Sequence, residues 1–201
     1  MHPAPAFLET DRDRLLRRID AWPFALVISV AETRPVVAHT PVLVDREGVL
    51  SFHLSRGNPA ARAIEASGRA LLVFSGPHDY ISPDWYEQND EVPTWNYLSV
   101  EAEGPVRALD DSGKTALLDR LSERFEGDLY PKPEWTRAKM SPGRFETMLG
   151  GIVAYTLAPD RLQGITKISQ NKPAEARKRA GAHLKAAGGD PTISAMMERD
   201  T

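Results

Sequence analysis

Short runs of β-branched and aromatic residues alternate with polar turns through most of the chain. Such runs are typical of strands, and the turns between the first three contain Arg34-Pro35 and Asp45-Arg46-Glu47-Gly48. We predict strands at 23–32, 35–45, 48–54, 69–76, 94–109 and 150–159. Three strands, a helix and another strand in succession favour antiparallel pairing over alternating parallel units, so we expect a small β barrel.

Helical spacing of apolar residues appears between and after these strands. We predict helices at 11–21, from Asn58-Pro59 to Ser67-Gly68, and at 112–125. At the second of these, Asn58 supplies a side-chain cap and Pro59 occupies the first turn. The segment 77–93 has no period and is predicted to be a long loop. An Ala-, Lys- and Arg-rich helical tail leads us to expect a main domain at 1–172 and an appendage at 173–201.

Composition narrows the classes of function. The 201 residues carry 25 Lys and Arg against 28 Asp and Glu, a net charge of −3, so no general attraction to polyanions is expected. The absence of cysteine removes disulfide, thiol and zinc-ribbon chemistry, and the five histidines are scattered, so we expect no metal site. Neither a leader sequence nor an apolar run of about 20 residues is visible, and we therefore expect a cytoplasmic protein without a membrane span.

The segment HLSRGNP joins a strand to a helix and is the first candidate site. It holds His53, Ser55, Arg56 and Asn58 around Gly57. Free N–H groups at a helix N-terminus attract anions, and an Arg can fork two hydrogen bonds onto a phosphate. An ordinary capped turn with a solvated Arg explains the same residues, and strand-to-helix turns of this kind are common.

The segment TKISQNK has an unusual density of hydrogen-bonding side chains. Lys167, Ser169, Gln170 and Asn171 could receive a polar heteroaromatic ring or a ribityl chain. A polar loop before the last helices is the simpler explanation, and the residues alone favour it.

Two further stretches could border a planar ligand. Trp95 and Tyr97 share one strand face and Asn96 the other, although such a Trp is more often part of a core. In VAHTPVLV, Pro41 follows His39 and Thr40 and cannot donate to a central ladder, so backbone groups near Val42 could bond a ring edge. An edge strand with a satisfied His is the alternative.

Signatures of other enzyme classes are missing. The sequence contains no GxxxxGK[ST], no GxGxxG before a helix and no GxSxG. His78, Asp79, Tyr80 and Asp84 offer acid and base groups without a nucleophile at a defined spacing. We therefore assign no catalytic residue.

Four blocks in order, HLSRGNP, VFSGPHDYISPDWY, VPTWNY and KISQNK, resemble the PaiB-type FMN-binding negative transcriptional regulators. The resemblance extends from PFALVIS to the Ala-rich tail. Wider relatives are the split β-barrel flavoproteins, such as pyridoxamine phosphate oxidases and flavin reductases. The resemblance implies a mainly β fold with flanking helices: a six-stranded antiparallel FMN-binding split barrel that forms a homodimer, with FMN at the subunit interface.

The resemblance also implies the cofactor contacts. His39, Thr40, Pro41 and Val42 would lie along the flavin ring, and His53, Ser55, Arg56 and Asn58 would take the ribityl phosphate. The site would be completed by Trp95, Asn96, Tyr97, Lys167, Ser169, Gln170 and Asn171. Asp79 and Asp84 stand where the family has smaller residues, and their charge would weaken FMN binding if they faced the phosphate.

Two functions follow from the resemblance. A flavin-binding repressor of transcription leads, acting on DNA directly or through a partner protein. No helix-turn-helix is apparent, and the basic residues at 177–179 with Lys185 could equally be a solvated helix face. The alternative is a small FMN-dependent oxidoreductase in which the cofactor supplies the chemistry.

Overall fold

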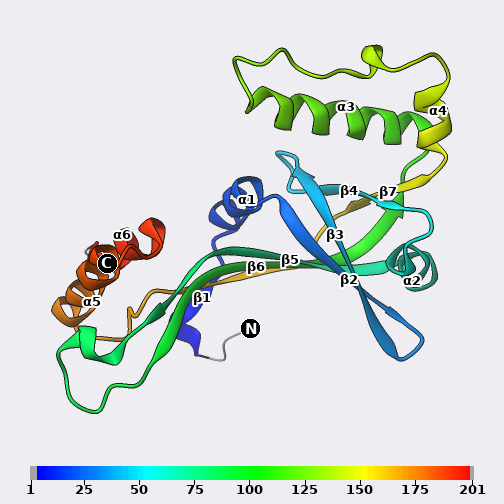
Figure 1. Ribbon diagram of the computed structural model, residues 1–201. Coiled ribbons are helices and arrows are strands. Elements are labelled where there is room, and N and C mark those ends of the chain that lie inside the picture. The colour runs from blue at the N-terminus through cyan, green and yellow to red at the C-terminus, as the bar shows by residue number, and fades with distance from the viewer. Residues whose placement is uncertain (1–3, 200–201) are drawn as a thin grey trace. The chain divides into compact units, whose positions relative to one another are not determined.

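The computed structural model describes residues 4–199 and is mainly an antiparallel β sheet with flanking helices. The strands are β1 (Leu8–Glu9), β2 (Phe24–Ala31), β3 (Arg34–Val44), β4 (Leu50–Ser55), β5 (Arg69–Ile81), β6 (Thr94–Ala108), β7 (Ile152–Leu157) and β8 (Arg161–Lys167). The helices are α1 (Arg12–Ala21), α2 (Pro59–Ser67), α3 (Asp111–Gly127), α4 (Arg144–Leu149), α5 (Ala174–Ala186) and α6 (Pro191–Glu198). Three short 3₁₀ helices are η1 (Pro5–Phe7), η2 (Pro83–Tyr86) and η3 (Arg137–Lys139). Figure 1 traces this order.

The sheet has eight strands in the order β1-β8-β6-β5-β2-β3-β4-β7, and β6 also pairs with β7. The expected count of six is therefore wrong for the sheet as a whole. The extra pairing closes β2-β3-β4-β7-β6-β5 into a ring, and β1 and β8 lie outside it. Gly164 and polar residues interrupt the apolar pattern of β8, so the sequence did not predict this strand.

The chain forms two compact units. Unit 1 comprises the residues up to Arg18, Ser75–Val100 and the residues from Gln163 onward. Unit 2 comprises Ile19–Phe74 and Glu101–Leu162. The expected boundary between residues 172 and 173 remains a prediction.

Helix ends follow the capping residues that the sequence offers. Asn58 Oδ1 accepts a hydrogen bond of 2.9 Å from Ala60 N, which confirms the predicted start of α2, and Gly68 ends that helix at φ 67°. Asp110 caps α3 through Gly113 N at 2.8 Å. The predicted loop at 77–93 is partly wrong, because β5 continues to Ile81 and η2 follows it.

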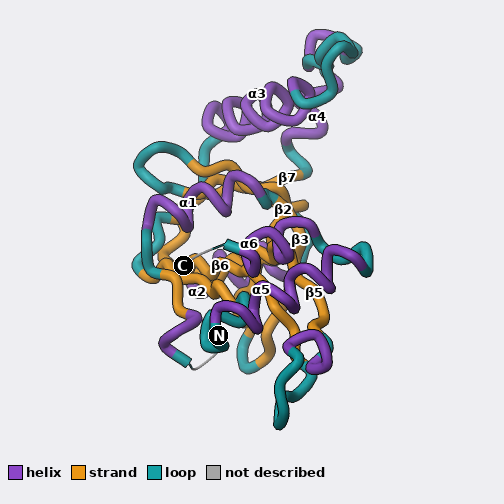
Figure 2. The backbone as a smooth tube through the Cα atoms, turned by 90° about the vertical axis from the view of Figure 1, so that its left-hand side faces the viewer, coloured by secondary structure: helices purple, strands orange, loops and turns teal. Residues whose placement is uncertain are grey.

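In unit 2, helix α3 lies over β4 and β7, and the short α4 lies beside one end of α3 (Figures 1 and 2). Leu117 and Leu121 of α3 pack on Ala154 of β7. The sequence predicts no element between residues 126 and 149, whereas the structure forms η3 and α4 there. This helical layer covers the outer face of the strands that carry the candidate site.

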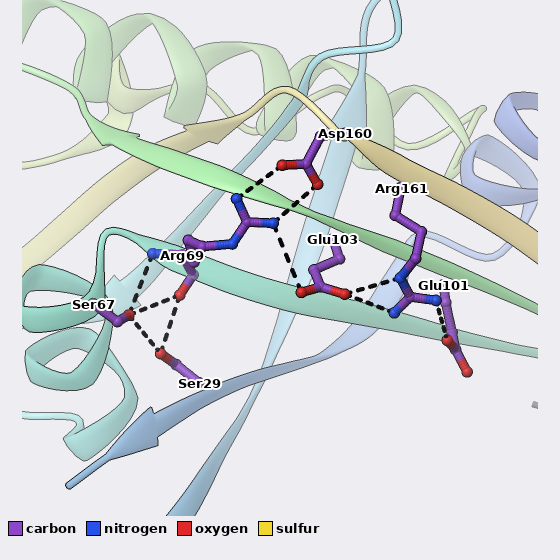
Figure 3. A network of polar contacts seen from close by, with 7 residues as sticks. All are labelled: Ser29, Ser67, Arg69, Glu101, Glu103, Asp160 and Arg161. Carbon is purple, nitrogen blue, oxygen red and sulfur yellow. Dashed lines mark hydrogen bonds and ion pairs between the residues drawn. The ribbon is translucent and has the colours of Figure 1, made fainter.

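A chain of ion pairs joins three strands and a turn of unit 2 (Figure 3). Arg69 makes a two-pronged contact with Asp160, at 2.8 and 3.0 Å, and approaches Glu103 at 3.7 Å. Arg161 bonds Glu103 at 2.9 Å and Glu101 at 3.0 Å. The side chains are partly exposed, so solvent screens the charges and the pairs contribute modestly to stability.

In unit 1, α5 and α6 pack against each other (Figure 2), and a buried arginine joins them. Arg177 is 2% exposed and donates to the backbone carbonyls of Met197, at 3.0 Å, and Arg199, at 2.6 Å. The ring of Trp85 in η2 stacks on His183 of α5. None of the helices formed by residues 4–199 has the length and apolar character needed to span a bilayer.

Candidate functional site

The outer face of β3, β4 and β7 in unit 2 carries several of the predicted cofactor residues. The register pairs His53 with Ala154 and Ser55 with Ile152. On β3 the pairs Val42–Phe52 and Leu43–Ser51, continued by one residue, set Pro41 opposite His53. Because side chains alternate along a strand, Pro41, His53 and Ser55 share this outer face.

Thr40 compensates for the hydrogen bond that Pro41 cannot make. Val42 N donates to Pro23 O at 2.8 Å, so the backbone of Val42 faces β2 and that of Pro41 faces β4. Proline has no N–H, and the carbonyl of His53 instead accepts from Thr40 Oγ1 at 2.6 Å. The buried Thr40 therefore fixes the main chain beneath the His53 side chain.

The imidazole of His53 has an unused polar atom. The side chain is half-buried, and its Nδ1 is buried with no hydrogen-bond partner. Burial lowers the pKa of His53, so the ring is neutral at physiological pH. A buried nitrogen without a partner is costly, and the residue that carries it also lines a cavity.

That cavity has a volume of about 460 Å³, within the range of small-molecule sites. It lies between the strands and the helical layer of α3 and α4. Its lining residues are Pro41, His53, Leu118, Asp119, Leu121, Ser122, Phe125, Glu126, Trp135, Arg137, Met140, Phe145, Met148, Leu149 and Ile152. A planar, mostly apolar ligand fits such a lining.

The turn after β4 presents an arginine to solvent. Arg56 Nε donates to Gly150 O at 3.0 Å, and Nη2 donates to Ile152 O at 3.1 Å. A guanidinium has five N–H groups, so these two bonds hold the Arg56 side chain in place and leave other N–H donors for an anion. Ser55 is exposed, and a Cβ on Gly57 would meet no atom within 4 Å. Together with the unpartnered His53, the turn fits a flavin that carries a phosphate.

His39 also lies on the outer face of β3 and is exposed. Its ring stacks on Phe24 of β2, with centroids 5.9 Å apart and planes at 23°. An exposed aromatic pair of this kind can extend a stacking surface for a planar ligand.

The remaining predicted site residues lie in unit 1. Trp95 is 54% exposed and contacts the rings of His78 and Tyr80. Tyr97, two residues along β6, is half-buried. These side chains offer an aromatic surface on β5 and β6.

Asn96 and Ser169 satisfy each other inside unit 1. Asn96 Nδ2 donates to Ser169 Oγ at 2.9 Å and to Met197 Sδ at 3.2 Å. Tyr86 OH lies 2.6 Å from the same Ser169 oxygen. Both Asn96 and Ser169 are buried, and Ser169 has a φ of 61°. Their visible role is to hold the segment after β8 in shape.

The other residues of that segment differ in exposure. Lys167 Nζ donates to Thr94 Oγ1 and lies over the ring of Phe7, and burial lowers its pKa. Gln170 Nε2 donates to Ala6 O at 2.9 Å. Asn171 is exposed and lines a second cavity of about 350 Å³ with Lys167.

Two groups of predicted residues result, one in each unit. Unit 2 holds His39, Thr40, Pro41, Val42, His53, Ser55, Arg56 and Asn58. Unit 1 holds Trp95, Asn96, Tyr97, Lys167, Ser169, Gln170 and Asn171. The helical side of the larger cavity was not predicted. The available signal there was the helical spacing of Phe145, Met148 and Leu149.

Asp79 has a structural partner. Its Oδ2 accepts from Asp190 N at 2.7 Å, and its Oδ1 accepts from Tyr80 N at 2.8 Å. Asp84 is exposed in the first turn of η2. The carboxylate of Asp79 therefore stabilises the N-terminal end of α6, where Asp190 is the capping residue.

Comparisons with known proteins show the family of this chain. Residues 1–161 match a family described as "Putative FMN-binding domain". The chain is 30% identical over 169 residues to the Protease synthase and sporulation protein PAI 2 of Bacillus subtilis (strain 168), covering 83% of this chain and 80% of that protein.

Solved structures resemble the fold. The FAD and heme binding protein from Mycobacterium smegmatis gives a TM-score of 0.62 at 23% identity, over 91% of this chain and 80% of that one. The flavocytochrome Anf3 from Azotobacter vinelandii gives 0.64 at 15% identity, over 83% and 72%. The PaiB-type resemblance of the motifs is confirmed, and the chain belongs to this family of FMN-binding domains.

Proposed function

We propose that this chain binds FMN as a homodimer and acts as a negative regulator of transcription. The observation that carries FMN binding is the outer face of β3 and β4. There His53, whose Nδ1 has no hydrogen-bond partner, lines a cavity of about 460 Å³, and Arg56 follows the end of the same strand. His39, Pro41 and His53 would meet the ring of the cofactor.

Arg56 and its neighbours would hold the phosphate. The two backbone carbonyls that accept from Arg56 orient its guanidinium before any ligand arrives, which reduces the entropy lost on binding. Ser55 adds an exposed hydroxyl, and Asn58 shapes the turn by capping α2. Thr40 and Val42 would contribute through the backbone that they position.

The remaining residues that we propose as cofactor contacts lie in unit 1. Trp95 and Tyr97 would offer ring surface, and Lys167, Gln170 and Asn171 would offer polar contacts. Asn96 and Ser169 are buried against one another, so their contribution would be to keep the segment after β8 in place.

A homodimer is supported by an apolar sheet face. The register places Leu26 beside His39 and Val73, and Ile28 beside Val37 and Leu71. Phe24, at 65% exposure, and Val37, at 53%, belong to the same face. An apolar patch on paired strands is typical of an interface, and this one continues to His39 and Pro41 of the proposed flavin site.

Repression through a partner protein fits the structure better than direct DNA contact by α5. Arg177 is buried in contacts with Met197 and Arg199, and Arg179 pairs with Glu87 at 3.2 Å. These side chains are therefore occupied within unit 1. The Bacillus relative is named a protease synthase and sporulation protein, and we propose a role in gene regulation for this chain. A cytoplasmic location is part of this proposal.

A small oxidoreductase is the second candidate, favoured by the size of the cavity beside His53. Bound FMN supplies hydride and electron transfer. The residues of the chain would bind and orient the ring and exclude water from one side of it.

The deciding experiment begins with the visible absorption spectrum of the purified protein after FMN addition and desalting. Flavin retained in about equal amount to the chain, with a mass of two chains in light scattering, supports the FMN-binding dimer. Absence of retained flavin contradicts the proposal. FMN-dependent oxidation of a pyridine nucleotide favours the oxidoreductase. A shifted promoter fragment, with affinity that falls steeply as salt rises, favours direct repression.

A further inference from the structure

The helical side of the large cavity is rich in aromatic side chains. Phe125 of α3, Trp135 of the segment between α3 and α4, and Phe145 of α4 line it, and we name these three residues the aromatic wall. Met140 and Met148 lie in the same lining. Aromatic rings favour stacked or edge contacts with other rings, and flexible thioethers adapt to the shape of a ligand.

Specific contacts hold this wall in position. Glu126 Oε2 accepts from Trp135 N at 2.8 Å, which ties the segment before η3 to α3. Arg137 Nε lies 3.1 Å from Asp119 Oδ1, and the Arg137 guanidinium lies 5.1 Å from the centroid of the Phe145 ring. These contacts therefore hold the helices and the segment that border the cavity in place.

The charged residues in the lining have opposite partners. Asp119 pairs with Arg137, and Glu126 pairs with Lys132 of the same segment. An ionic ligand would lose its hydration without gaining a free counter-ion. The lining thus favours an uncharged molecule.

Part of the cavity lining remains exposed to water. Trp135 of the aromatic wall is 39% exposed, and the neighbouring lining residue Met148 is 53% exposed. Burial of apolar surface by a ligand contributes roughly 25 cal/mol per Å². The exposed surface supplies a driving force for binding.

We propose that the aromatic wall binds an uncharged aromatic molecule beside FMN, as the effector or substrate of the flavin site. The inference rests on the proposed function, because the FMN ring is assigned to the strand side of the cavity, at Pro41 and His53. The helical side then receives the second molecule. The ligand class is set by the wall: planar, apolar and without formal charge.

The test uses FMN-loaded protein and menadione, a neutral naphthoquinone, in isothermal titration calorimetry. The FMN content of each sample is measured by its visible absorbance. The variants are Trp135→Ala and Phe145→Leu. Tyr130→Ala is the matched control, because Tyr130 belongs to the same segment, is exposed and does not line the cavity. A sulfonated menadione tests the preference for an uncharged ligand.

We expect menadione to bind FMN-loaded protein, with affinity about tenfold lower in Trp135→Ala and unchanged in Tyr130→Ala. We expect the sulfonated analogue to bind about tenfold more weakly than menadione. Phe145→Leu replaces a ring of the wall by another apolar side chain, and it should weaken binding less than Trp135→Ala.

Three results would overturn the inference: no binding to FMN-loaded protein, equal binding by Trp135→Ala, or release of FMN as menadione binds. The last would mean that the flavin itself fills the cavity. If the protein takes up no FMN yet binds menadione with the expected loss in Trp135→Ala, the proposed function fails and the aromatic site stands.

Discussion

The hydroxyl of Thr40 donates a 2.6 Å hydrogen bond to the backbone carbonyl of His53, at the position where Pro41 has no N–H to offer. The contact joins β3 to β4 at the centre of the candidate flavin site. The small buried side chain of Thr40 therefore fixes the backbone that carries the larger, half-buried side chain of His53.

Replacing Thr40 by Val removes this hydrogen bond and keeps the shape of the side chain. The carbonyl of His53 would then lack a partner in a buried strand, so we expect a loss of about 1 to 3 kcal/mol in the free energy of unfolding. Urea denaturation measures it. Thr40→Ser retains the hydroxyl and should lose much less; equal losses in the two variants would argue against the hydrogen bond.

Removing the guanidinium of Arg56 should weaken FMN binding. We expect Arg56→Ala to lower the FMN affinity by about 1.5 to 3 kcal/mol, the usual contribution of a hydrogen bond to a charged group. Fluorescence titration with FMN measures the change. Arg46→Ala, at an exposed turn between β3 and β4, is the control. If both variants bind FMN as the parent does, Arg56 is not a phosphate ligand.

A charge on the apolar face of β2 and β3 should separate the proposed dimer. Val37 is 53% exposed, so Val37→Glu costs the folded chain little and places a carboxylate in the proposed interface. We expect light scattering to report the mass of one chain for Val37→Glu. Val92→Glu, at an exposed valine in unit 1, should leave the mass unchanged. A dimer that survives Val37→Glu would exclude this face.

The buried contacts of Ser169 predict coupled losses. Ser169→Ala leaves both Tyr86 and Asn96 short of a partner, and we expect a cost of about 1 to 3 kcal/mol in unfolding free energy. Tyr86→Phe removes one of these bonds and should cost about 0.5 to 1.5 kcal/mol. Because the bond is shared, the double variant should lose less than the sum. Additive losses in urea denaturation would show that the bond contributes nothing.

The half-buried imidazole of His53 predicts a pH dependence of stability. Its pKa in the folded chain lies below the ordinary value of about 6.5 for histidine. The unfolded chain therefore binds the proton more readily, so the contribution of His53 is complete above about pH 6.5 and declines as the pH falls towards the folded pKa.

We expect the cofactor-free parent to lose stability relative to His53→Gln as the pH is lowered from about 7 to about 5. Urea denaturation across this range checks it, and the comparison cancels the titration of other groups. Parallel curves for the two proteins would contradict the prediction.

Local signals in the sequence predicted most elements. Asn58 and Gly68 mark the ends of α2, and the β-branched runs match β2, β3 and β4. The sequence predicts that the strand starting at residue 69 ends at Gly76, but β5 continues to Ile81. Turn-forming residues such as Gly76 and Pro77 do not reveal that backbone pairing continues past them. Where a strand ends in such a segment depends on its pairing partners, which are distant in the sequence.

The candidate site was only partly predictable, for a similar reason. Polar side chains such as Asn96 and Ser169 look like ligand contacts in the sequence, yet they are 73 positions apart and bond each other. Trp135 gives no periodic signal, and only the fold places it beside His53 in the lining of one cavity. The family motifs identified the strand side of the cavity, and the structure added the helical side.

The ion-pair chain of unit 2 has a consequence for natural variation. Arg161 sits between Glu101 and Glu103, so loss of this arginine alone would leave two carboxylates facing each other without a cation between them. Related chains that lack it should carry an altered residue at the position of at least one of these glutamates. We therefore expect substitutions at positions 101, 103 and 161 to be correlated among related chains.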